Sequence, residues 1–156
     1  MGIKLGNCDI ETSRISLGTV KFGRNTDVKY PRHFEIPGDK KIVNLLSKAQ
    51  ELGVNLLDTA PAYGNSEERI GHLLPGQRKD WILCTKAGEQ YSKGQSVYDF
   101  SKSALEQNVA QSLQRLKTDY LDIVLIHSNG DDLDILHRTD AMDTLQRLKE
   151  KGDIRY

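Results

Sequence analysis

The sequence lacks the features that mark secreted, metal-binding and membrane-spanning chains. Its 156 residues include only two cysteines, Cys8 and Cys84, which lie far apart and form no Cys-x-x-Cys motif. Neither a disulfide framework nor a metal site is therefore expected. No apolar run approaches the roughly 20 residues needed to span a bilayer, and residues 1–12 hold no apolar stretch typical of a secretory signal. We expect a soluble, cytoplasmic protein.

The sequence also lacks net charge. Lysine and arginine together number 22, as do aspartate and glutamate, so the formal charge is zero. Proteins that bind nucleic acid or an anionic membrane usually carry an excess of positive charge on one face. We therefore expect no nucleic-acid or membrane partner, and look instead for a small-molecule ligand.

Short β-rich segments alternate with longer helical patterns along the chain. The predicted strands are residues 15–20, 54–57, 81–86 and 120–127, with the start of a fifth at 154–156. The predicted helices are residues 39–52 and 66–74, one from near Ser101 or Ser103 to 116, and one over 137–151. Residues 87–96 are read as a Gly/Ser-rich loop. This order predicts parallel strands joined by helical crossovers.

Two α/β architectures fit this order: an open doubly wound sheet, or part of an eight-stranded (β/α)8 barrel. An open sheet that binds a dinucleotide usually carries Gly-x-Gly-x-x-Gly after its first strand. Residues 18–23 read Gly-Thr-Val-Lys-Phe-Gly and lack that spacing. The missing motif favours the TIM barrel.

Three predicted strands end an apolar row with an ionisable side chain. Residues two apart in a strand share a face, so Asp58, Lys86 and His127 each follow apolar side chains on one face. Barrel active sites lie at the carboxyl ends of the strands. Each residue alone is common in a structural role, but three in register favour a functional site. Tyr63 follows Asp58 closely enough to fold over the same opening.

These residue types suit the protonation of a carbonyl oxygen. A phenol is a weak acid at neutral pH, and a nearby lysine ammonium favours its phenolate. A paired aspartate keeps the lysine charged, and a neutral histidine can donate a hydrogen bond to a polarised oxygen. The set would protonate an alkoxide while a hydride reaches the carbonyl carbon. No side chain donates hydride, so an external cofactor is required.

The motifs that carry these residues resemble those of the aldo-keto reductase superfamily. Residues 53–71, GVNLLDTAPAYGNSEERIG, are similar to the family segment around its catalytic aspartate and tyrosine. Thr85-Lys86 resembles the strand with the catalytic lysine, and residues 120–127 the strand with the catalytic histidine. Residues 4–6 and 16–23 are similar to the N-terminal hairpin and first strand of bacterial members.

The resemblance implies a (β/α)8 barrel that uses NADPH to reduce an aldehyde or ketone. Residues 1–156 would be the N-terminal part of one barrel domain: the hairpin, four β/α units and the start of the fifth strand. By this resemblance Tyr63 is the proton donor, and Lys86 and Asp58 tune it. His127 orients the substrate carbonyl. The positions that approach the nicotinamide end of the cofactor are Thr19, Val20 and Asp58.

The chain also departs from the family, whose members are about twice as long and grip the cofactor through their second half. Residues 152–156 break off inside a strand, so we expect a truncated chain from a longer protein. An apolar row would then lack cover, so we expect the isolated chain to dimerise, aggregate or pair with a C-terminal fragment. That row is Leu56, Ile82, Ile123 and Leu125.

Two alternatives to the enzyme remain at this point. One is a non-catalytic NADPH-binding regulatory or subunit protein of the same fold, similar to the potassium-channel β subunits. The other is a half-barrel that dimerises into a complete barrel. The intact Tyr-Lys-Asp-His set favours the enzyme, because cofactor binding alone does not require the acid.

Overall fold

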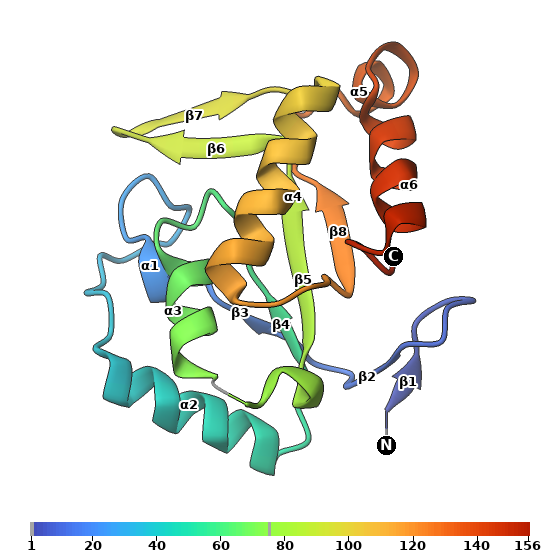
Figure 1. The fold of residues 1–156 in the computed structure, drawn as a ribbon. Helices are drawn as coiled ribbons and strands as arrows, with labels where there is room; N and C mark the ends of the chain where they lie inside the picture. Colours follow the sequence, from blue (N-terminus) through green and yellow to red (C-terminus); the bar gives the residue numbers. More distant parts are fainter. Residues whose placement is uncertain (1, 75) are drawn as a thin grey trace.

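A four-stranded parallel sheet organises the chain. The computed structural model describes residues 2–74 and 76–156. Its central strands lie in the order β3, β4, β5 and β8, each parallel to its neighbours (Figure 1). They span Leu17–Gly18, Leu56–Asp58, Ile82–Ala87 and Ile123–Ile126. Strand, helix, strand order with parallel pairing confirms the predicted α/β fold, built as part of a barrel.

Helices cover one face of this sheet. The four that pack there are α2 (Asp39–Glu51), α3 (Ser66–Leu73), α4 (Lys102–Leu116) and α6 (Ala141–Lys151) (Figure 1). Their apolar side chains join those of Leu57, Leu83 and Leu121 in the main core. Each helix therefore contributes an apolar stripe to the outer side of the barrel segment. The shorter elements are α1 (Val20–Gly23), η1 (Arg78–Asp80) and α5 (Asp132–Arg138).

The other face of the sheet is partly covered by the N-terminal hairpin of β1 (Ile3–Lys4) and β2 (Glu11–Thr12). Ile10, in this hairpin, packs against Cys84 and Ile123, with Leu56 and Ile82 beside them. Three residues of the apolar row predicted to lack cover, Leu56, Ile82 and Ile123, are therefore packed against the hairpin. The fourth, Leu125, remains 44% exposed.

The predicted first strand is shorter than expected. Only Leu17–Gly18 pairs with β4, and Val20, predicted as strand, is the first residue of α1. The chain turns because the Phe22 amide donates to the Thr19 carbonyl and the Phe22 side chain enters the core. Gly23 permits this turn to pack closely, since a Cβ there would lie 2.4 Å from the Tyr63 carbonyl oxygen.

Residues 87–96 hold a hairpin where a loop was predicted. Strand β6 (Glu89–Ser92) pairs antiparallel with β7 (Gln95–Tyr98). The two residues between them, Lys93 and Gly94, both have positive φ, as a tight hairpin turn requires. The hairpin stands apart from the central sheet (Figure 1).

The predicted helix over 137–151 is two helices, α5 and α6. Thr139 separates them: its hydroxyl donates to the Ile135 carbonyl and accepts from the Ala141 amide. Of the two predicted starts of α4, near Ser101 or Ser103, the structure shows the first. Ser101 caps the helix, and its hydroxyl accepts a hydrogen bond from the Ala104 amide.

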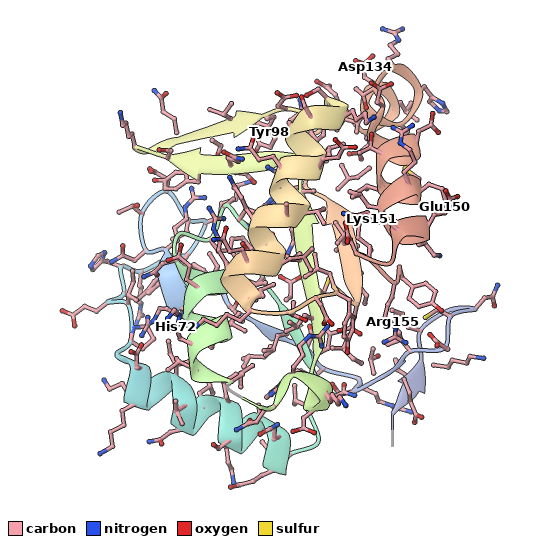
Figure 2. All side chains as sticks on the ribbon, in the orientation of Figure 1. His72, Tyr98, Asp134, Glu150, Lys151 and Arg155 are labelled. Carbon is pink, nitrogen blue, oxygen red and sulfur yellow. The ribbon has the colours of Figure 1, made fainter. Side chains whose placement is uncertain are left out.

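The last residues begin a fifth strand beside β8. Ile154 bridges Leu121 in parallel, and the Val124 amide donates to the Tyr156 carbonyl at 2.8 Å. Arg155, labelled in Figure 2, donates to Asp122 at 2.7 Å and to Asp9, in the β1–β2 connection, at 3.0 Å. These contacts join the C-terminal segment to the N-terminal hairpin at the amino-terminal end of the sheet.

Candidate active site

Asp58 and Lys86 form an ion pair at the carboxyl end of the sheet. Lys86 Nζ donates to Asp58 Oδ1 at 2.8 Å and Oδ2 at 2.9 Å, and to the Thr59 carbonyl at 3.0 Å. The ammonium is therefore held by the Asp58 carboxylate and by a backbone carbonyl. The Lys86 side chain is only 12% exposed, so the charge is held in a fixed place rather than in solvent.

Strand register explains how these side chains meet. Asp58 pairs with Cys84, so Lys86 lies two residues further along β5 on the same face. Its long side chain reaches back to the carboxylate. The His127 amide donates to the Ala87 carbonyl at 2.8 Å, which places His127 at the same rim on the next strand.

Tyr63 lies in the turn between β4 and α3, over the same rim. Its ring meets the His127 ring edge-on, with centroids 6.2 Å apart, and the Lys86 ammonium lies 4.9 Å from its ring centroid. The structure thus brings together all four residues predicted as catalytic: Asp58, Tyr63, Lys86 and His127.

Surrounding charges set the protonation states of two of them. Burial has the largest influence on Lys86 and lowers its pKa, but the hydrogen bond and charge of Asp58, with Tyr63, raise the pKa above its ordinary value. Burial also lowers the pKa of His127, and the net effect of its neighbours leaves it below the ordinary value. At neutral pH Lys86 is therefore charged, and burial favours the neutral form of His127.

A buried hydroxyl cluster supports the backbone beneath Asp58. The Thr19 hydroxyl donates to the Asp58 carbonyl at 2.9 Å. Ser66 Oγ lies 2.9 Å from both oxygens of Thr19 and 3.2 Å from the Thr59 hydroxyl. Thr19 is 0% exposed, so in this structure its side chain positions Asp58 and offers no surface to a cofactor.

The other two predicted cofactor positions are accessible. Val20 is half-buried at the start of α1, and the Asp58 side chain is partly exposed. Gly18 pairs with Asp58 in the sheet, and a Cβ built on Gly18 would meet nothing within 4 Å. Open space therefore lies beside the Asp58 carboxylate at the strand ends.

Sequence reasoning missed Glu89, the first residue of β6. Its Oε2 lies 2.8 Å from His127 Nδ1, and its Oε1 accepts from Ser96 Oγ at 2.5 Å. A signal was available, since residues 89–98 combine a Lys-Gly turn with flanking tyrosines and a valine. The Gly/Ser content of that segment concealed it.

Arg24 fastens the loop after α1 to this site. It donates to the Ala62 carbonyl at 3.1 Å and to the Asp27 carbonyl at 2.9 Å. Its guanidinium stacks 3.4 Å from the centroid of Tyr91 in β6, and the Tyr91 hydroxyl donates to Asp27 Oδ2. The loop after α1 and the β6–β7 hairpin therefore contact each other along one side of the site.

The structure describes residues 2–74 and 76–156. Within them, no group of three or more histidine, cysteine, aspartate or glutamate side chains is placed to hold a metal ion. In the same part of the chain, no helix combines the length and apolar character needed to cross a bilayer.

Comparison with known proteins agrees with the geometry. The model of the Aldo/keto reductase family matches residues 14–156. The oxidoreductase YqkF of Bacillus subtilis, described as uncharacterized, is 35% identical, covering 98% of this chain and 46% of its own length. The NADH-specific methylglyoxal reductase of Escherichia coli is 32% identical, covering 98% of this chain and 49% of its own.

Solved structures share the fold. A putative aldo-keto reductase from Pseudomonas aeruginosa superposes with a TM-score of 0.91 at 47% identity, over 99% of this chain and 57% of that one. The aldo-keto reductase AKR11C1 from Bacillus halodurans, in its holo form, gives 0.78 at 30% identity, over 99% and 48%. The chain thus spans about half the length of the relatives it matches.

Proposed function

This chain belongs to the aldo/keto reductase family, and from that premise we propose that the protein reduces an aldehyde or ketone to an alcohol with NADPH. The observation that carries the proposal is the convergence of Asp58, Tyr63, Lys86 and His127 at one rim of the sheet. Cofactor binding alone would not require a phenol, an ammonium and an imidazole in contact. The enzyme is therefore favoured over a non-catalytic NADPH-binding subunit.

Each residue has a distinct part in the proposed reaction. The nicotinamide, when bound, supplies the hydride that reaches the carbonyl carbon. The Tyr63 hydroxyl gives its proton to the carbonyl oxygen, and the Lys86 charge stabilises the phenolate that remains. The ammonium lies 4.9 Å from the centroid of the Tyr63 ring, close enough for its charge to favour the phenolate. His127 donates to the same oxygen and orients it.

We further propose that the nicotinamide ring rests beside Asp58, Val20 and the open side of Gly18, with Thr19 acting through Asp58. NADPH is preferred over NADH in this proposal because the resemblance implies it. One relative is named as NADH-specific, so both cofactors belong in the assay. A cytoplasmic location stays a prediction, which fractionation of cells tests.

The exposed inner face supports a proposal about what completes the site. Leu125 is 44% exposed inside the barrel segment. We propose that further β/α units cover it, supplied by the same polypeptide or by a second chain. Covering this face would close the rim around the four residues and exclude water from the reaction.

The test measures oxidation of NADPH or NADH by the purified protein, expressed from its own gene, with an aromatic aldehyde as the carbonyl substrate. We expect turnover with NADPH that Tyr63→Phe lowers at least a hundredfold. The matched control is Tyr98→Phe, a tyrosine on the exposed strand β7, which should leave the rate unchanged. Cofactor binding without turnover would instead support the non-catalytic subunit.

A further inference from the structure

A buried carboxylate faces the histidine of the proposed site from outside the central sheet. Glu89 is 6% exposed, and Ser96, on the paired strand β7, fixes its Oε1 through a hydrogen bond of 2.5 Å. Its other oxygen lies 2.8 Å from His127 Nδ1. Among the described residues Nδ1 has no aligned hydrogen-bond partner and no contact with solvent. Glu89 is therefore the neighbour that determines what Nδ1 does.

The short separation of the two atoms favours a proton on one of them. A bare imidazole nitrogen and a bare carboxylate oxygen would present lone pairs to each other and repel at 2.8 Å. A proton on either atom turns this repulsion into attraction, and a small rotation of either side chain would align it. We therefore assign at least one proton to the pair. A proton on Nε2, the other ring nitrogen, is then the second.

We propose that Glu89 is a positioning residue for His127. Because Glu89 faces Nδ1, Nε2 of His127 donates a hydrogen bond only when the Glu89–His127 pair holds two protons. With one proton the pair keeps it at Nδ1, and Nε2 becomes an acceptor. The inference rests on the proposed carbonyl reduction. There, the two-proton pair can bind the carbonyl oxygen, and the one-proton pair can bind the hydroxyl of the alcohol product.

Charges on every side of the pair bear on the second proton. Burial has the largest influence and favours its loss, as do Lys86 and Arg24, whereas Asp58 favours its retention. The Tyr63 ring packs edge-on against the imidazole. Because these groups interact strongly, the titration belongs to the pair as a whole. The expected sign is that carbonyl reduction falls as pH rises through this step.

The first test reads the His127 tautomer directly, without any assay of activity. In protein labelled with 15N at histidine, long-range nitrogen–proton spectra distinguish a proton on Nδ1 from one on Nε2. His127→Asn assigns the signal. At alkaline pH we expect His127 to carry its proton on Nδ1. In both Glu89→Ala and Glu89→Met, which remove the carboxylate, we expect the proton on Nε2.

The chain supplies its own references for this experiment. His72 Nδ1 lies 2.8 Å from the Glu68 carbonyl, which only accepts, so its Nδ1 proton should persist in every variant. Glu150→Gln changes an exposed carboxylate on α6 and should leave His127 unaffected. His72 and Glu150 are labelled in Figure 2. An Nε2 proton on His127 in the unmodified protein at alkaline pH overturns the proposal. So does an Nδ1 proton that persists in a folded Glu89 variant.

The second test is the pH profile of carbonyl reduction. We expect kcat to fall with rising pH in the unmodified protein and in Glu150→Gln. In Glu89→Met a neutral ring can carry its proton on Nε2, so this fall should disappear. Loss of orientation should lower kcat itself roughly 10- to 100-fold, with KM changed less. An unchanged profile in Glu89→Met argues against the proposal.

The two proposals can fail separately. If Tyr63→Phe retains full turnover, the proposed reduction is wrong whatever the tautomer of His127. If Tyr63→Phe abolishes turnover and the unmodified protein keeps its His127 proton on Nε2 at alkaline pH, only the coupling to Glu89 is wrong.

Discussion

Gly64 and Gly23 approach each other so closely that neither has room for a side chain. A Cβ on Gly64 would lie 2.1 Å from the Gly23 carbonyl oxygen, and Gly64 has a φ of +64°. The contact joins α1 to the turn that carries Tyr63. The position of the proposed proton donor therefore depends on two residues that perform no chemistry.

Gly64→Ala should displace Tyr63. We expect a loss of about 1–3 kcal/mol in the free energy of unfolding, from the positive φ and the clash together, and a larger fractional loss of kcat. Gly53→Ala is the matched control, because Gly53 also has a positive φ but open space around it. Urea unfolding and the aldehyde assay measure the two effects. Equal losses of activity in both variants would contradict a special role for the Gly23–Gly64 contact.

Lys86→Met should remove the charge beside Tyr63 while keeping most of the side-chain volume. We expect kcat to fall roughly 10²- to 10⁴-fold, with a smaller change in stability because Asp58 stays partly hydrated. Lys48→Met, which breaks an exposed pair with Glu51, should leave kcat unchanged. Steady-state kinetics across several aldehyde concentrations separates the effect on kcat from one on KM. Retention of kcat in Lys86→Met would rule out the proposed charge effect.

Glu67, on α3, gives a pH dependence of stability that does not involve the site. Burial is the main cause that raises its pKa, although Thr85, Ser112 and Arg115 oppose it. The folded chain therefore binds this proton more tightly than the unfolded chain. The resulting stabilisation is complete below the ordinary value of 4.5 and is lost as pH rises through the folded pKa.

Glu67→Gln should remove this dependence while keeping an acceptor for the Thr85 hydroxyl, 2.6 Å away. We expect the variant to gain stability relative to the unmodified chain as pH rises, and to match or fall below it under acidic conditions. Urea unfolding at a series of pH values measures the difference. A constant difference between the two proteins across pH would contradict the assigned cause.

Much of the site could be predicted because it follows from two local rules. Side chains alternate along a strand, and parallel strands end at one rim, so Asp58, Lys86 and His127 were placed together by spacing alone. Tyr63 lies in a turn, where no periodicity applies, so its placement depended on its closeness to Asp58 along the chain, and the family resemblance supplied its role as proton donor. Its placement in the structure is set by close contacts such as Gly64 with Gly23.

Glu89 could not be placed by the same rules. It belongs to a hairpin outside the sheet, and its approach to His127 depends on the turn at Lys93-Gly94 and on the anchor from Ser96. Val20 was misassigned for a related reason. The burial of Phe22 converts the end of the predicted strand into a helical turn, and that burial is a tertiary effect.

The inner face makes a prediction for the isolated 156-residue chain. Leu125 is 44% exposed beside Lys86, its partner in the β5–β8 register, and β3 has a paired neighbour on one side only among the described residues. Exposed apolar faces and unpaired edges drive association. We therefore expect light scattering to give a mass above the 17.6 kDa monomer.

Leu125→Asp should weaken the association, because it places a charge on the exposed face. Leu133→Asp, on α5 away from the inner face, should do so less. A monodisperse monomer with a cooperative melt would instead mean that the hairpin and helices satisfy this face without a further chain.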